Sequence, residues 1–384
     1  MAQQFMAEKE SMVRTRFAPS FARLCRRAAV LCLLSLAACA PSLAPPGSEA
    51  EAPYFSAHAF ITRDGLSLPL RQWDARKPRA IIVALHGMSD YSEAFEMPGP
   101  WFAAHGITML AYDQRGFGAA PDRGIWAGSA RMRQDLRGMV MAVHARYPGL
   151  PVFALGESMG GAVVLSALAD HDPPPIAGAI LAAPAVWARE DMPLSYRVVL
   201  FLAAHLVPWL KLSGQGLHIL PSDNIPMLIK LSRDPLFQHH ARVDQIYGLV
   251  NLMDEARRAP EHLISPPPIL YLYGAHDQII PPKSAEDTIA ALGGRATVVE
   301  FPNGYHMLLR DLDRKLVWRT ILKWVDAHLS RNPAMSSTRI SSSFRTRKTS
   351  VAVMRAPAKA DPQAMGENPH KGAAAVEKSE RARR

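Results

Sequence analysis

The segment that most constrains this chain is residues 151–165, which read Leu-Pro-Val-Phe-Ala-Leu-Gly-Glu-Ser-Met-Gly-Gly-Ala-Val-Val. An apolar strand runs into Gly-Glu-Ser-Met-Gly and then directly into a small-residue helix. At such a sharp turn the backbone around Ser158 is strained, so Gly156 and Gly160 on either side must lack bulk. The turn exposes the Ser158 hydroxyl. We therefore expect Ser158 to be a catalytic nucleophile; the alternative is a glycine-rich turn with an inert serine.

A serine hydroxyl is a weak nucleophile at neutral pH and needs a histidine base that an acid orients. A β-rich run at residues 269–274 places Asp277 on the loop just beyond a strand, and a second strand at 296–301 does the same for His306. Active sites of open α/β sheets lie at that edge. The chain order Ser158, Asp277, His306 is that of α/β hydrolases and differs from the orders in chymotrypsin and subtilisin.

Other residues of the same types compete for these roles. His276 adjoins the acid and can hardly be held by it, so an exposed loop position is expected. Three further acids, Asp287, Asp311 and Asp313, fall in stretches with a helical pattern, and we expect them to be solvated.

Acyl transfer also needs donors for the negative charge that develops on the carbonyl oxygen, and these are typically two backbone N–H groups. One is expected from Met159, directly after the nucleophile. The strand at residues 80–85 leads into His86-Gly87-Met88, so Met88 is expected to supply the second. We expect His86 to orient that loop, with no part in the chemistry.

Together these motifs resemble the monoglyceride lipase and lysophospholipase branch of the α/β hydrolases, over roughly residues 55–330. They are His86-Gly87-Met88, Tyr112-Asp113-Gln114-Arg115-Gly116, Gly156-Glu157-Ser158-Met159-Gly160-Gly161, the Asp277 loop and Gly304-Tyr305-His306. The resemblance implies that Ser158, Asp277 and His306 are catalytic and that Asp113 and Arg115 are structural or shape the pocket. Many relatives carry histidine where this chain has Glu157, which leaves the acyl and alcohol preference open.

The first forty residues predict export. Several arginines precede an apolar stretch of 11 residues, 28–38, which is too short to span a bilayer, since a spanning helix needs about 20. We therefore expect residues 1–38 to be a signal peptide. Leu36-Ala37-Ala38-Cys39 resembles the bacterial lipobox, in which the cysteine becomes the lipidated first residue of the mature protein. The alternative is an ordinary secretory signal cut nearby. Ala40 after the cysteine favours an outer-membrane location, facing the periplasm.

Cysteine usage agrees with export. All three cysteines of the chain, Cys25, Cys32 and Cys39, lie in this leader, so a disulfide framework or a cysteine nucleophile is not expected in the body. The sequence contains no His-Glu-x-x-His pattern, so we expect no metal. Gly116-Phe-Gly118 lacks the third glycine of a dinucleotide fingerprint, and we expect no cofactor.

The net charge of +10 belongs to the ends of the chain. Residues 331–384 hold 12 of the 44 Lys and Arg residues, and residues 39–330 hold 26 basic against 28 acidic side chains. The body is thus about neutral, and we expect no nucleic-acid partner. The basic tail, 331–384, lacks apolar periodicity and is expected to be disordered. It can adhere to anionic lipid or cell-wall polymer, or be a solvated extension without a partner.

Between the ends, predicted strands and helices alternate, which predicts an α/β-hydrolase fold with a mostly parallel sheet and helices on both faces. Residues 39–54 read as a linker and 55–330 as one hydrolase domain. An apolar insertion at about 186–260 interrupts the alternation and is expected to form a helical cap over Ser158; helices that merely cover the sheet edge are the alternative.

The sequence thus predicts a serine hydrolase, anchored to a bacterial membrane through a lipid on Cys39, that cleaves lipid-type carboxylic esters such as monoacylglycerol or lysophospholipid through an acyl-enzyme. Three alternatives remain open: a small-ester carboxylesterase, an aminoacyl peptidase of the same superfamily, and a lipid-binding lipoprotein without catalysis. Acyl length, head group and oligomeric state are not determined by the sequence.

Overall fold

The computed structural model of the protein describes residues 41–45, 47, 52–214, 216, 219–329 and 354–355. The predicted signal peptide, Cys39 and nearly all of the basic tail lie outside these residues. Met354–Arg355 of the tail is the exception, because it forms a short strand, β12, that pairs with β11 (Ala296–Phe301). No helix within the described residues has the length and apolar character to cross a membrane.

Strand β4 (Ala80–Leu85) is buried along its whole length, and its side chains alternate between two cores. Ile81, Val83 and Leu85 contribute to one core, whereas Ala80, Ile82 and Ala84 contribute to the other. Because successive side chains of a strand point to opposite faces, a strand buried throughout must be covered on both sides. The sheet is therefore the middle layer of three.

Within the part of the chain that the structure describes, the sheet has ten strands in the order β1-β2-β3-β5-β4-β6-β7-β10-β11-β12. From β5 to β12 neighbouring strands are parallel, and β1, β2 and β3 form the antiparallel end. The strands not yet given bounds are β1 (Tyr54–Phe55), β2 (Ala59–Ile61), β3 (Ser67–Trp73), β5 (Ile107–Tyr112), β6 (Val152–Glu157), β7 (Gly178–Ala182) and β10 (Ile269–Gly274). The mostly parallel sheet predicted from the alternating pattern is confirmed.

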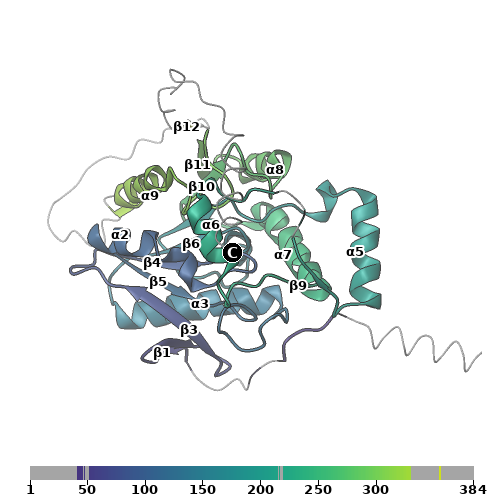
Figure 1. Ribbon diagram of the computed structural model, residues 1–384. Helices are drawn as coiled ribbons and strands as arrows, with labels where there is room; N and C mark the ends of the chain where they lie inside the picture. The colour runs from purple at the N-terminus through teal and green to yellow at the C-terminus, as the bar shows by residue number, and fades with distance from the viewer. Residues whose placement is uncertain are drawn as a thin grey trace, which may run out of the picture.

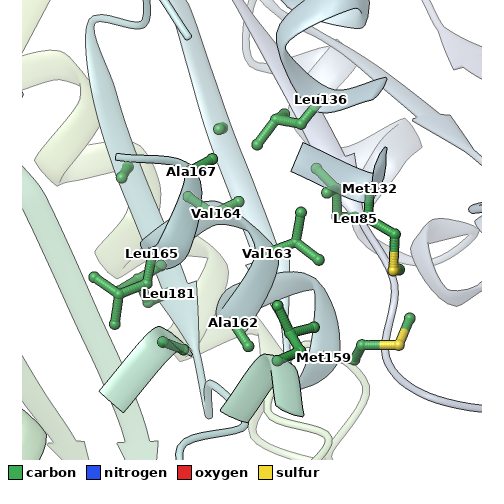
Figure 2. Close-up of a cluster of buried hydrophobic side chains, with 14 of the residues drawn as sticks. Leu85, Met132, Leu136, Met159, Ala162, Val163, Val164, Leu165, Ala167 and Leu181 are labelled. Atoms are coloured by element: carbon green, nitrogen blue, oxygen red, sulfur yellow. The ribbon is translucent and has the colours of Figure 1, made fainter. Parts of the chain in front are cut away.

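Helices cover both faces of the sheet (Figure 1). One core contains side chains of α3 (Ser129–Arg146), α4 (Met159–Ala167), α7 (Val243–His262) and α8 (Pro282–Leu292). The opposite core contains side chains of α2 (Pro98–Ala104) and α9 (Arg314–Leu329). Figure 2 shows α4 among apolar side chains of its neighbours, with Leu85 and Leu181 from the sheet and Met132 and Leu136 from α3. The helix that follows Ser158 is thus fixed on all sides.

The predicted insertion contains several short elements between β7 and β10. They are a 3-10 turn, η2 (Arg189–Asp191), two helices, α5 (Leu194–Leu206) and α6 (Ile225–Ser232), and two paired strands, β8 (Lys211–Leu212) and β9 (Ala241–Arg242). Helix α7 follows and packs against α4, so it belongs both to the insertion and to the layer that covers the sheet. Helix α5 lies at the periphery, against the outer side of α7 (Figure 1).

Candidate active site

Ser158 stands between β6 and α4 with φ 54° and ψ −116°, a backbone conformation that few non-glycine residues adopt. The flanking glycines make this turn possible. A Cβ on Gly156 would collide with the backbone of Gly160, and a Cβ on Gly160 would collide with the carbonyl of Leu85 in β4. Ser158 itself is half-buried, at the start of a buried helix. The turn therefore has the strain and the steric demand that the sequence predicted.

His306 and Asp277 meet at the carboxyl edge of the sheet, as predicted. Nδ1 of His306 lies 2.8 Å from Oδ2 of Asp277, and both side chains are buried. Oδ1 of Asp277 accepts the backbone N–H groups of Ile279 and Ile280 at 2.8 and 3.0 Å. Burial would raise the pKa of Asp277, but the hydrogen bond from His306 and these two N–H groups outweigh it, and the pKa is lowered. Asp277 is therefore held as a carboxylate that fixes the imidazole.

The loop after β4 lies directly against Ser158. A Cβ placed on Gly87 would stand 3.2 Å from Cβ and 3.7 Å from Oγ of Ser158. Met88 follows Gly87 in this loop and lines the same cavity as Ser158. Met159 is the first residue of α4, so its N–H has no partner one turn earlier in the helix. The two expected oxyanion donors, Met88 and Met159, thus belong to the two segments that lie next to Ser158.

His86 is fully buried and holds the shape of this loop. Its Nδ1 lies 2.8 Å from the carbonyl oxygen of Gly87, and its Nε2 accepts the N–H of Gln114 at 2.9 Å. Burial lowers the pKa of His86, which keeps the ring neutral so that Nε2 can accept. Both ring nitrogens of His86 are hydrogen-bonded to backbone groups, as expected for a histidine that orients a loop.

The rival residues fall in different places. His276 is exposed and stacks on Tyr305, as expected for a loop residue. Asp287 forms a hydrogen bond with Lys283 at the surface of α8.

Asp311 contradicts the expectation of a solvated helical face, because it is 2% exposed and lies in the turn before α9. It accepts the N–H of Tyr305 at 2.8 Å and the hydroxyl of Ser222 at 2.6 Å. Helical periodicity alone could not predict that Asp311 is buried and hydrogen-bonded, because its partners Tyr305 and Ser222 lie in two segments far apart in the sequence.

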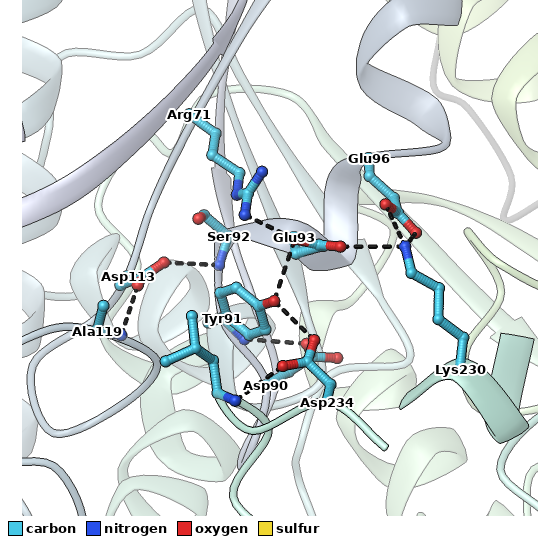
Figure 3. A network of polar contacts seen from close by, with 11 residues as sticks. Arg71, Asp90, Tyr91, Ser92, Glu93, Glu96, Asp113, Ala119, Lys230 and Asp234 are labelled. Carbon is cyan, nitrogen blue, oxygen red and sulfur yellow. Dashed lines mark hydrogen bonds and ion pairs between the residues drawn. The ribbon is translucent and has the colours of Figure 1, made fainter. Parts of the chain in front are cut away.

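Asp113 and Arg115 have structural contacts: Asp113 accepts backbone N–H groups, and Arg115 forms buried ion pairs. Asp113 accepts the N–H groups of Ser92 and Ala119 at 2.9 and 2.8 Å (Figure 3). Arg115 forms buried ion pairs with Asp64 and Asp135, which join the start of the domain to α3. Neither side chain lines the cavity at Ser158.

A cavity of about 1020 Å³ opens beside Ser158 and His306. Its walls are mainly apolar and come largely from the insertion: Tyr196, Val199 and Leu200 of α5, and Leu249, Val250 and Met253 of α7. Such a space fits an extended hydrocarbon chain. The predicted cap therefore does contribute the wall of the candidate site, and α7 both covers the sheet and lines the cavity.

Polar contacts attach the cap to the loop after β4 (Figure 3). Nζ of Lys230, on α6, lies 3.1 Å from Glu93 and 2.6 Å from Glu96. The hydroxyl of Tyr91 donates to Asp234 at 2.7 Å. Glu93 and Glu96 are partly exposed, so each single pair contributes little to stability. Together they fix where α6 sits above the loop that carries Met88.

Sequence reasoning missed one buried charged group. Arg310 lies four residues after His306, and its Nη2 is 2.7 Å from Asp90 and 3.0 Å from Glu157. All three side chains are almost fully buried and reach the cavity wall. The spacing from His306 gave no signal, because the partners are distant in the chain. Within the described residues no three His, Cys, Asp or Glu side chains are grouped as ligands for a metal ion.

Comparison with known proteins places these residues in context. Residues 76–313 match the family described as serine aminopeptidase, S33. The chain is 28% identical over 289 residues to a monoglyceride lipase of Homo sapiens, covering 73% of this chain and 94% of that protein. It is 24% identical over 281 residues to a monoacylglycerol lipase of Mycolicibacterium smegmatis, covering 71% and 98%. A crystal structure of a soluble variant of monoglyceride lipase from Saccharomyces cerevisiae in complex with a substrate analog superimposes with a TM-score of 0.60, at 19% identity, over 75% of this chain and 99% of that one. The last similarity confirms the fold.

Proposed function

The chain belongs to the α/β-hydrolase family described as serine aminopeptidase, S33, and on that premise we propose that it is a serine hydrolase acting on carboxylic esters of lipid type. The relatives named monoglyceride and monoacylglycerol lipase support the substrate class. The observation that carries the proposal is the apolar cavity beside Ser158 and His306, because a long acyl chain is the ligand that such walls favour. Monoacylglycerol and lysophospholipid are the substrates that fit this description.

The proposed reaction assigns one step to each of these residues. Oγ of Ser158 attacks the ester carbonyl, while Nε2 of His306 takes the hydroxyl proton and returns it to the leaving alcohol. Asp277 holds Nδ1–H of the imidazole and stabilises the imidazolium. The N–H groups of Met88 and Met159 stabilise the oxyanion. Water then hydrolyses the acyl-enzyme by the same steps, and no cofactor takes part.

An aminoacyl peptidase is the second candidate, because the family description names one and because Asp90 and Glu157 bring two carboxylates to the cavity wall. An unpaired carboxylate there would bind the free amine of a peptide. Arg310 occupies both carboxylates, however, and so neutralises much of their charge. This pairing favours a neutral ester over an amine.

A substrate series separates these candidates. The purified protein is assayed on nitrophenyl esters of increasing chain length, on monoacylglycerol and lysophospholipid, and on aminoacyl nitroanilides. We expect kcat/KM to rise with chain length beyond butyrate and the nitroanilides to be poor substrates. A maximum at acetate would favour a small-ester carboxylesterase. Rapid nitroanilide hydrolysis would favour the peptidase.

A fluorophosphonate probe addresses the remaining alternative, a lipid-binding lipoprotein without catalysis. The probe labels only an activated serine, so we expect one label on the wild type and none on a Ser158→Ala variant. A wild type that binds lipid but resists labelling would favour the non-catalytic alternative.

We also propose that the enzyme is held at a bacterial membrane by acylation of Cys39. Support comes from the lipobox-like Leu36-Ala37-Ala38-Cys39 and from α5, where seven large apolar side chains are at least 47% exposed. They are Leu194, Tyr196, Val198, Val199, Phe201, Leu202 and Leu206. Since Tyr196 and Val199 also line the cavity, this helix can receive single-chain lipids from a bilayer.

The anchor is tested with Cys39→Ala. The variant should be released or remain as an unprocessed precursor, yet hydrolyse a soluble short-chain ester at the wild-type rate. Fatty-acid labelling and membrane fractionation of both forms provide the measurement. An unlabelled wild type, or a variant that stays mature and membrane-bound, would contradict the anchor and leave the catalytic proposal intact.

A further inference from the structure

Arg310 is a buried cation at the centre of the candidate site. It lies in the turn between His306 and α9, and its side chain is 5% exposed. Its Nη2 lies 2.7 Å from Oδ2 of Asp90 and 3.0 Å from Oε2 of Glu157. Both carboxylates are also buried, so the three charges have one another as their nearest ionic partners.

Each partner of Arg310 belongs to a different part of the catalytic machinery. Glu157 is the last residue of β6 and immediately precedes Ser158. Asp90 lies two residues after Met88, and its Oδ1 accepts the N–H of Tyr91 at 2.9 Å. Arg310 itself shares a turn with His306. One guanidinium therefore connects the nucleophile turn, the oxyanion loop and the histidine turn.

The backbone of the same turn is attached to the cap. The carbonyl of Arg310 accepts Nδ2 of Asn224 at 2.8 Å, and the N–H of Met307 donates to the carbonyl of Pro221 at 2.9 Å. Met307 follows His306 directly. The histidine turn is thus held on one side by the Arg310 side chain and on the other by residues 221–224 of the cap.

The sheet alone cannot fix the distance between the serine and the histidine. Ser158 follows β6, whereas His306 follows β11, and β7 and β10 lie between these strands. Backbone hydrogen bonds attach the turn that carries His306 to the loop after β10, where the N–H of His276 donates to the carbonyl of Gly304 at 2.9 Å, but the turn must still cross the edges of β7 and β10 to reach Ser158. A misplacement of about 1 Å between reacting groups can lower the rate about a hundredfold, so a cross-link at this point has catalytic value.

On the basis of the function proposed above, we propose that Arg310 is a positioning residue that locks the His306 turn against Ser158 and the Met88 loop through Glu157 and Asp90. A single nitrogen, Nη2, contacts both carboxylates, and the rigid planar guanidinium holds that nitrogen in place more firmly than the flexible stem of a lysine holds an ammonium. Buried ion pairs of this kind stabilise one arrangement more than they stabilise the fold.

The charges in the site agree with this role. Burial alone would lower the pKa of Arg310, but the charges of Asp90 and Glu157 outweigh it and keep the guanidinium charged. Burial raises the pKa of Glu157 even with Arg310 beside it. Removal of Arg310 would leave two buried carboxylates without a cation, so a simple truncation can unfold the protein.

The test therefore uses three variants. Arg310→Lys keeps the charge but replaces the planar guanidinium with a flexible ammonium, and Arg310→Met removes both the charge and the guanidinium. Arg310→Met combined with Glu157→Gln and Asp90→Asn removes all three charges at nearly constant volume. Arg319→Met, an exposed arginine on α9, is the matched control. Each is measured for melting temperature and for kcat and KM on nitrophenyl butyrate.

We expect the neutral triple variant to fold with a melting temperature near that of the wild type and to lose at least about a hundredfold in kcat, with KM within threefold. Arg310→Lys should recover part of this loss, and Arg319→Met should match the wild type. A folded triple variant with wild-type kcat would overturn the proposal. So would a raised KM with unchanged kcat, because Arg310 would then bind substrate.

A second measurement does not depend on turnover. The Nδ1–H proton of His306, bonded to Asp277, should give a downfield proton resonance in the wild type that broadens or disappears in the folded triple variant. An unchanged resonance there would overturn the positioning role. If the wild type shows this resonance but hydrolyses no ester, the proposed function fails while the effect of Arg310 on His306 is still measured.

Discussion

The carboxylate of Asp277 lies 2.8 Å from Nδ1 of His306, although the two residues lie in loops that follow different strands, β10 and β11. The parallel pairing of these strands brings their carboxyl ends together, with Gly274 opposite Phe301. Asp277 also accepts two backbone N–H groups, and these bonds fix the orientation of its carboxylate independently of His306. The geometry of the proposed base thus depends on the register of two neighbouring strands.

Replacement of Ser158 by alanine should abolish ester hydrolysis, with a fall in kcat of at least about a thousandfold, and should leave the fold intact. The change removes a half-buried hydroxyl and no packed side chain. Circular dichroism and melting temperature verify folding. Ser195→Ala, on the cavity wall in α5, is the matched control and should retain activity. Activity of Ser158→Ala within tenfold of the wild type would show that Ser158 is not the nucleophile.

Asp277→Asn should lower kcat by about three to four orders of magnitude, because an amide in place of the carboxylate no longer fixes the imidazole tautomer. Asp287→Asn is the control, since this carboxylate bonds Lys283 at the surface. Steady-state kinetics on one soluble ester measures both. If the two variants behaved alike, the acid would have to be sought elsewhere.

Gly160→Ala should destabilise the protein by about 3 kcal/mol or more, because the new Cβ would collide with the carbonyl of Leu85 in the central strand β4. Gly214→Ala has open space around its Cβ and should lie within about 0.5 kcal/mol of the wild type. Urea unfolding of both variants provides the comparison. A Gly160→Ala protein as stable as the wild type would mean that β4 and α4 are not in such close contact.

The buried carboxyl of Asp311 makes stability depend on pH. Burial raises the pKa of Asp311 from 3.8 to about 7, although Ser222 and the N–H of Tyr305 act against this rise. The folded protein therefore binds more protons than the unfolded chain between these values. Its contribution to stability is present at low pH and is lost as the pH rises from about 4 to about 7.

Comparison with Asp311→Asn isolates this contribution, because other titrating groups cancel in the difference. The melting temperature of the variant minus that of the wild type should increase by several degrees from pH 4 to pH 8. Calorimetry at five or six pH values measures it. A difference that stays constant over this interval would show that Asp311 titrates at its ordinary pKa in the folded protein.

Much of the candidate active site could be predicted from the sequence, because its signals are local. Gly156, Ser158 and Gly160 form one turn whose strain and steric demands involve neighbours in the chain. Asp277 and His306 each follow a run of strand-forming residues, and parallel strands end at the same edge. The alternation of β and α segments likewise predicts a layered sheet, since a strand buried on both faces requires helices on both sides.

The tertiary structure alone decided which distant groups meet. Asp311 follows a helical pattern in the sequence, yet it is buried because segment 221–224 of the cap returns to the histidine turn. Arg310 carries no local signal at all, since its partners Asp90 and Glu157 come from loops after β4 and at the end of β6. Local propensity determines strands and turns over a few residues, whereas ion pairs and cavity walls depend on how strand order and cap folding bring remote segments together. The residues of the proposed triad could therefore be predicted from the sequence, whereas the contacts that position them depend on the fold.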